Sequence, residues 1–232
     1  MSQNKTNNRR QGLIVIGAVV AIAVIVVGVA IAMSGNTGSS VDYSAIPQSR
    51  AADGGFTLGD PNAPVTIIEF ADFACPHCQN YHPTMSRFIN DYVATGQAAF
   101  EYRNFPSTGG ALTRFMAQVM ECSDEQQPGA FWVAHDLLYD YATTNRYTED
   151  AARDIARELN INYSDLLTCT ADANQINVDE RLGMSNGVNG TPAVMIRYNG
   201  GPAQFITHEG VTYNRGSVPF DVLAAVVEAN QS

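Results

Sequence analysis

The stretch at residues 69–78, EFADFACPHC, constrains this chain more than any other part of its sequence. An apolar, β-branched run at 65–70 leads into it, and a proline follows the first cysteine, so the pattern predicts a buried strand that turns into a helix near Cys75. Cys75 and Cys78 then lie one helical turn apart. Two cysteines at this spacing can close a disulfide or jointly bind a metal ion.

The N-terminal part predicts a membrane anchor. Residues 13–33 carry no charge and are rich in Val, Ile and Ala, and this length is enough to cross a bilayer. Lys5, Arg9 and Arg10 precede the segment, which predicts a cytoplasmic N-terminus (1–12) and an extracytoplasmic remainder. A cleaved signal is the alternative, because AIA at 30–32 resembles a cleavage site. Both interpretations place the rest of the chain outside the cytoplasm.

Beyond the apolar segment, residues 34–55 are rich in Gly, Ser and Ala and predict a flexible linker to a folded domain at 56–232. The chain after residue 40 has 10 basic and 23 acidic residues, a formal charge of −13. An acidic field of this size argues against binding to nucleic acid or to an anionic membrane surface.

The folded part alternates between strand and helix patterns. We expect strands at 65–70 and 98–105 with a helix between them, a block of helices at about 107–186, a hairpin at 193–198 and 203–208, and a last helix at 220–229. This order predicts an α/β fold in which helices cover a mixed sheet and a helical insertion interrupts it.

Cys75 is expected at a helix N-terminus, where free N–H groups and the helix dipole stabilise a thiolate. His77 could add a positive charge or a hydrogen bond to the same sulfur. Stabilising the reduced form in this way makes a cysteine pair an oxidant of other thiols. Cys78 would be the buried resolving thiol. Glu69, on the strand beneath, is either its proton donor and acceptor or a partly solvated strand residue.

A zinc site is the main alternative. Cys75, Cys78 and His82 form a C-x2-C-x3-H pattern that supplies three ligands, but no second close pair offers a fourth. The other two cysteines, Cys122 and Cys169, are isolated in the sequence. One close pair and two distant cysteines indicate one reactive pair and one structural bridge, if the compartment is oxidising.

From about Phe56 onward the sequence resembles the DsbA-like thiol–disulfide oxidoreductases of the thioredoxin fold. The resemblance is carried by GDPNAPV at 59–65, by EF and CPHC within 69–78, and by VNGTPA at 188–193. It implies a thioredoxin-like fold with a helical insertion at about 107–186. Phe73 and Ala74 precede the first cysteine, where thioredoxins proper have Trp, which favours the DsbA side of the superfamily.

The resemblance also implies roles for individual residues. Cys75 would be the attacking cysteine and Cys78 the resolving one, with Pro76 and His77 tuning the pair and Glu69 as the acidic residue behind it. Pro192 would be a cis-proline facing the disulfide, and Thr191 before it would offer backbone hydrogen bonds to an extended substrate. Membrane-anchored relatives hold a second cysteine pair in the insertion, which implies a structural disulfide between Cys122 and Cys169.

The sequence therefore predicts an extracytoplasmic oxidoreductase, monomeric and held in the cell membrane by a single span, that oxidises free thiols of exported proteins. Its only redox group would be the Cys75–Cys78 disulfide, with no further cofactor and no metal. The resemblance implies reoxidation by a quinone-linked membrane partner of the DsbB or VKOR type. A reductase or isomerase on the same fold is one alternative. A redox-inert or zinc-holding module that binds peptides is another.

Overall fold

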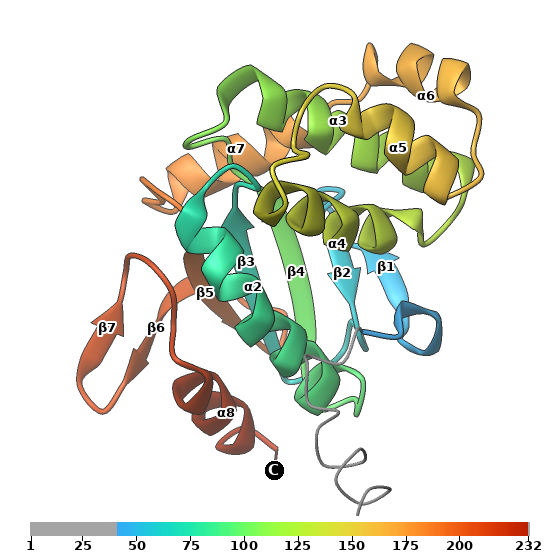
Figure 1. Cartoon of the computed structure of the whole chain (residues 1–232). Helices are drawn as coiled ribbons and strands as arrows, with labels where there is room; N and C mark the ends of the chain where they lie inside the picture. The colour runs from blue at the N-terminus through green and yellow to red at the C-terminus, as the bar shows by residue number, and fades with distance from the viewer. Residues whose placement is uncertain (1–40, 232) are drawn as a thin grey trace, which may run out of the picture. The chain divides into compact units, whose positions relative to one another are not determined.

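A computed structural model describes residues 41–231 and shows a mixed α/β fold in which helices cover a central sheet (Figure 1). The sheet order is β1-β2-β4-β3-β5-β6-β7, and β3 and β4 are parallel while every other neighbouring pair is antiparallel. The strands of the described part are β1 (Gln48–Arg50), β2 (Phe56–Leu58), β3 (Val65–Ala71), β4 (Ala99–Asn104), β5 (Ala193–Tyr198), β6 (Gln204–His208) and β7 (Val211–Tyr213).

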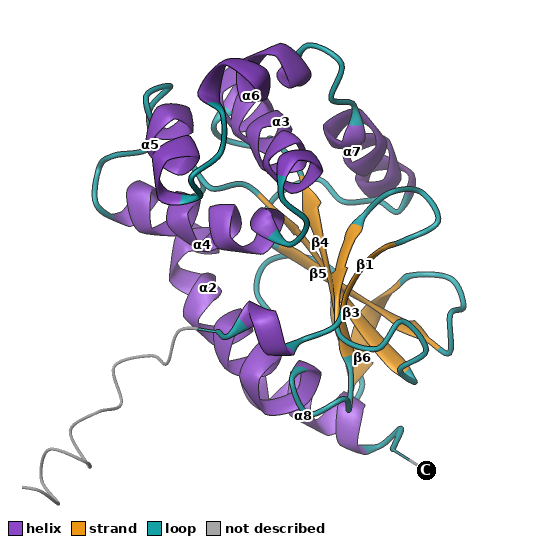
Figure 2. Ribbon diagram, turned by 90° about the vertical axis from the view of Figure 1, so that its right-hand side faces the viewer, coloured by secondary structure: helices purple, strands orange, loops and turns teal. Residues whose placement is uncertain are grey.

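Helices enclose both faces of this sheet. They are α2 (Pro76–Phe88), which continues as a π-helical turn (Ile89–Val93), α3 (Gly110–Gln126), α4 (Ala130–Thr143), α5 (Ala151–Glu158), α6 (Tyr163–Thr170), α7 (Gln175–Ser185) and α8 (Phe220–Glu228). A short 3-10 turn (Tyr43–Ala45) precedes β1. In Figure 2, α2, α4 and α8 lie on one side of the sheet and α7 on the other. Helices α3 to α7 come between β4 and β5, so the predicted α/β fold with a helical insertion is confirmed.

Strand β3 lies between β4 and β5, and its seven residues are all buried, as expected for a central strand that reads as a nearly continuous apolar run. Its side chains alternate between the two faces. Val65 and Ile67 pack in the core beneath α2, whereas Ile68 and Phe70 pack in the smaller core that Leu182 of α7 covers. This alternation places Glu69 on the α2 side of the sheet, the side on which the cysteines lie.

A flexible linker was predicted for residues 34–55, but the described part of this segment, residues 41–55, is folded into the domain. Val41, Tyr43 and Ile46 are buried in the main core, and β1 pairs with β2, which in turn pairs with β4. The prediction was wrong here because the segment as a whole is rich in Gly, Ser and Ala, and its few large apolar residues had little weight in that composition. Tyr43 stacks on Trp132 and donates a hydrogen bond to Asp136, and both residues belong to α4, which lies much later in the sequence.

The predicted N-terminal segment 1–12 and membrane anchor 13–33 lie outside the described residues. Within residues 41–231, none of the helices has the length and apolar character needed to span a bilayer.

Candidate active site

Cys75 caps the N-terminus of α2. Its backbone is extended (φ −79°, ψ 118°), and Pro76 occupies the first turn, where a missing N–H leaves no hydrogen bond unmade. Only 5% of the Cys75 surface is exposed, and its thiol donates to the carbonyl oxygen of Thr191 at 3.3 Å. Cys75 and Cys78 are both free, so the structure represents the dithiol form.

The surroundings displace the pKa values of the two thiols in opposite directions. Burial opposes ionisation of Cys75, but hydrogen bonds from the Thr191 side chain and from the backbone N–H groups of Cys78 and His77 outweigh it and lower the pKa of Cys75. Cys78 is fully buried, and burial together with the nearby Glu69 charge raises its pKa. One thiol is therefore poised as a nucleophile and leaving group, while its partner is held as a neutral thiol.

Glu69 lies beneath this pair on β3, opposite Tyr102 of β4 and Val194 of β5. It is 2% exposed, which excludes the partly solvated strand residue considered as an alternative, and its Oε1 has no hydrogen-bond partner among the described residues. Burial raises the pKa of Glu69 to about 8. A carboxyl group with such a pKa can donate or accept a proton near neutral pH.

The loop that faces Cys75 contains the Thr191–Pro192 peptide bond, which is cis, as the family resemblance implies. Ala193 pairs with Phe70 in the β3–β5 ladder, and this pairing brings the loop beside the end of β3 where Cys75 follows. The Thr191 hydroxyl lies 2.5 Å from that of Ser107, which ties the loop to the segment between β4 and α3. No motif or pattern in the sequence indicated this role for Ser107.

Asp72 organises the turn before Cys75, a role that the sequence analysis did not assign. Its carbonyl oxygen accepts from the Cys75 N–H at 2.9 Å, and its buried carboxylate accepts from the N–H groups of Ala74, Thr108 and Gly109 at 2.6 to 2.9 Å. The carboxylate thereby joins the cysteine loop to the start of α3. An aspartate two residues before a backbone N–H is a common turn former, and this signal could have identified it.

A groove of about 820 Å³ opens beside Cys75. His77 is exposed and is one of the residues that line this groove, and its effect on the Cys75 sulfur comes through its backbone N–H. The other lining residues come from the cis-proline loop and from the segment before α8: Asn189, Gly190, Thr191, Pro192, Arg215, Gly216 and Ser217.

The three residues proposed as zinc ligands do not converge. The His82 ring turns away from the cysteines and stacks on Tyr139 of α4, with ring centroids 4.2 Å apart. His82, His135 and Asp136 instead form one of two groups in the described part whose ligand atoms lie within 4.8 Å of one another. Because α2 directs His82 toward α4, the C-x2-C-x3-H pattern does not form a metal site.

Cys122 and Cys169 form a disulfide, which is the pairing that the resemblance implies. It joins α3 to α6 inside the helical block and closes a sequence separation of 47 residues. The reactive pair and the bridge therefore lie in different elements of the fold.

Comparisons with known proteins agree with this geometry. The chain is 27% identical over 153 residues to the probable disulfide bond formation protein D of Bacillus cereus, a match that covers 62% of this chain and 70% of that protein. It is 31% identical over 145 residues to the Na(+)/H(+) antiporter NhaA 3 of Salinispora tropica, covering 60% of this chain but only 21% of that protein.

The fold is similar to that of α-DsbA1 from Wolbachia pipientis, with a TM-score of 0.63 at 20% identity over 78% of this chain and 93% of that chain. The family model described as "Thioredoxin" matches residues 51–200, which include β3, both reactive cysteines and the cis-proline. This chain belongs to the thioredoxin family.

Proposed function

We propose that this chain is a protein disulfide oxidoreductase that introduces disulfides into exported proteins through Cys75 and Cys78. One observation carries the proposal: a thiol of lowered pKa at a helix N-terminus lies next to a buried thiol of raised pKa and faces a cis-proline loop and an open groove. The name of the Bacillus cereus relative, a probable disulfide bond formation protein, supports the same activity.

In the oxidised form, a substrate thiolate attacks the Cys75 sulfur. A bond forms between the two sulfurs, the Cys75–Cys78 bond breaks, and Cys78 leaves with the electron pair. Because the pKa of Cys78 is raised, this thiolate takes up a proton, and Glu69 with a pKa of about 8 is the nearby donor.

A second substrate thiolate then attacks the substrate sulfur of the mixed disulfide. The lowered pKa of Cys75 makes it the better leaving group, so Cys75 departs as a thiolate and the substrate gains a disulfide. The two electrons of the substrate now reside on the Cys75–Cys78 dithiol.

The direction of electron flow follows from the stability of that dithiol. Every group that stabilises the Cys75 thiolate stabilises the reduced enzyme and makes its disulfide a stronger oxidant. The Thr191 side chain and the N–H groups of His77 and Cys78 all act this way, which favours an oxidase over a reductase or isomerase.

The proposal includes the cellular setting that the sequence predicts. The apolar segment 13–33 would hold the monomer in the cell membrane with the catalytic domain outside the cytoplasm. A quinone-linked membrane protein of the DsbB or VKOR type would reoxidise the dithiol. The location is tested by treating intact cells with a membrane-impermeant phosphine, which reduces the Cys75–Cys78 disulfide, and then labelling Cys75 with a membrane-impermeant thiol reagent. A cytoplasmic domain would be protected from both reagents.

Equilibration of the purified full chain with mixtures of reduced and oxidised glutathione tests the activity. We expect the Cys75–Cys78 pair to be reduced under conditions that leave thioredoxin oxidised, and Cys75→Ser to abolish transfer of oxidising equivalents to a reduced protein substrate. A potential close to that of thioredoxin would identify a reductase instead. Efficient reshuffling of wrong disulfides without net oxidation would identify an isomerase.

A further inference from the structure

The groove beside Cys75 has a charge opposite to that of the protein as a whole. The chain after residue 40 has a formal charge of −13, yet no carboxylate is among the eight residues that line the groove. Two of the eight, His77 and Arg215, carry basic side chains, and both are exposed.

Arg215 also differs from most arginines of the molecule. Of the ten in the described part, six pair with a carboxylate: Arg87, Arg103, Arg114, Arg146, Arg157 and Arg197. Arg50 and Arg153 lie over aromatic rings. Arg181 on α7 and Arg215 are the two that have neither kind of partner among residues 41–231. Of these two, Arg215 is the one that lines the groove.

The backbone around Arg215 is held close to the cis-proline loop. Gly216 forms a β-bridge with Ala193, the residue after Pro192. Two residues further on, Val218 is buried, and its carbonyl oxygen accepts a hydrogen bond from the Tyr81 hydroxyl at 2.9 Å. Arg215 is therefore fixed on the rim of the groove by contacts on its C-terminal side, while its guanidinium stays exposed.

We propose that Arg215 makes the groove selective for extended substrate segments that carry Asp or Glu beside the reacting cysteine. The inference rests on the proposed oxidoreductase function and specifies the substrate of that site. A guanidinium that has no ion-pair partner can donate two parallel, charge-assisted hydrogen bonds to a carboxylate. The net negative charge of the chain after residue 40 opposes the binding of such a segment elsewhere, so the groove becomes its favoured place of encounter.

The test uses the full chain in a neutral detergent and two peptides that differ only in having Asp or Asn next to one cysteine. The rate at which each peptide reduces the Cys75–Cys78 disulfide is measured at low and high salt. We expect the Asp peptide to react about three- to tenfold faster at low salt, an advantage that salt reduces because the charges are solvated.

The Arg215→Gln variant should abolish this preference, and Arg215→Glu should reverse it. Arg153→Glu is the matched control, because it makes the same charge change at an exposed position on α5, which lies far from the β6–β7 hairpin that precedes Arg215 (Figure 1). The control should keep the wild-type preference.

Equal rates for the two peptides in the wild type, or a preference that survives Arg215→Glu, would overturn the inference while leaving the oxidoreductase function intact. A disulfide that reacts with neither peptide would overturn both. The two failures are therefore distinguishable in a single set of measurements.

Discussion

Three side chains at the active site have pKa values that their positions displace. Cys75 is stabilised as a thiolate by the end of α2 and by Thr191, whereas Cys78 and Glu69 are held in their neutral forms by burial. The alternation of β3 directs Glu69 to the α2 side, and the helical spacing places Cys78 one turn inside. Glu69 can therefore exchange the proton of disulfide exchange, while the adjacent Cys75 and Cys78 carry the electrons.

The lowered pKa of Cys75 depends in part on Thr191, so we predict that Thr191→Val raises it. The substitution keeps the shape of the side chain and removes a hydroxyl that can donate to the thiolate. The pKa is read from the ultraviolet absorbance of the thiolate during a pH titration of a Cys78→Ala background. Thr168→Val, an exposed hydroxyl on α6, is the control. An unchanged titration in the Thr191 variant would refute this role.

Glu69 makes stability depend on pH, with a sign that its pKa determines. The folded-state pKa of about 8 lies above the ordinary value of 4.5, so between these values the folded protein binds more protons than the unfolded chain. The contribution of Glu69 to the free energy of unfolding therefore falls as pH rises through this window, by at most about 1.4 kcal/mol per pH unit.

We predict that Glu69→Gln removes this decline, because the amide fills the same space without a charge. Urea unfolding at a series of pH values should show the variant gaining on the wild type as the pH increases from acid to about 8. Parallel curves for the two proteins would mean that Glu69 ionises with an ordinary pKa.

The residues that sequence reasoning identified share one property. Cys75, Cys78 and Pro192 lie in short motifs whose chemistry is visible in neighbouring letters, and Glu69 stands at a fixed offset from the first of them. Asp72 forms a local turn that the sequence could have indicated, but its bonds to Thr108 and Gly109 join it to a distant segment. Arg215 is distinguished by having no ion-pair or aromatic partner among residues 41–231. No local pattern in the sequence expresses either of these two conditions.

At the scale of elements, the long periodic segments were predictable and the short edge strands were not. Strand β3 and helix α8 lie close to the predicted ranges, and α2 lies between β3 and β4 as predicted. Strands β1, β2 and β7 have three residues each, too few to show a period of two. Their existence depends on pairing partners, such as β4 for β2, that are distant or equally short.

The bridge between α3 and α6 permits a prediction about the helical block. Removing a disulfide that spans 47 residues releases the unfolded chain, which in a chain-entropy treatment costs about 4 kcal/mol of stability. Cys169→Ala removes the bridge without creating a cavity at the fully buried Cys122. We expect its urea midpoint to fall substantially while the rate of exchange at Cys75 stays within a factor of about two of the wild type. A large loss of exchange would show that the block positions the active site.

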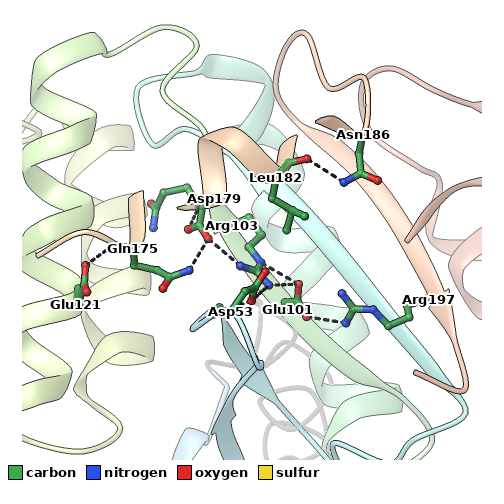
Figure 3. Close-up of polar contacts among 11 residues, drawn as sticks. Asp53, Glu101, Arg103, Glu121, Gln175, Asp179, Leu182, Asn186 and Arg197 are labelled. Carbon is green, nitrogen blue, oxygen red and sulfur yellow. Dashed lines mark hydrogen bonds and ion pairs between the residues drawn. The ribbon is translucent and has the colours of Figure 1, made fainter. Parts of the chain in front are cut away.

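At the scale of the whole molecule, one buried cation joins distant parts of the chain. Arg103 of β4 is fully buried and contacts Glu101, Asp179 of α7 and Asp53 before β2, at 2.7 to 2.9 Å (Figure 3). Glu101 also accepts from Arg197 of β5. Burial raises the pKa of Asp179 to about 6, even though Arg103 acts in the opposite direction. These contacts lie on the sheet face opposite the cysteines, where they connect the insertion to the N-terminal strands.

The last prediction concerns this cluster. Arg103→Met leaves Asp179 buried without a cation and leaves Glu101 paired with Arg197 alone. Breaking a buried ion pair by removing one partner costs about 3 to 5 kcal/mol. Arg114→Met is the matched control. Arg114 pairs with Glu180 of α7, the helix that also carries Asp179, but the Arg114 side chain is 39% exposed, and solvated pairs contribute at most about 1 kcal/mol. Chemical denaturation should therefore separate the two variants clearly. Carboxylates that have lost the Arg103 cation become neutral in acid. The Arg103 variant should therefore recover part of its stability as the pH falls through the range in which they titrate. A simple packing defect would instead leave the loss of stability independent of pH.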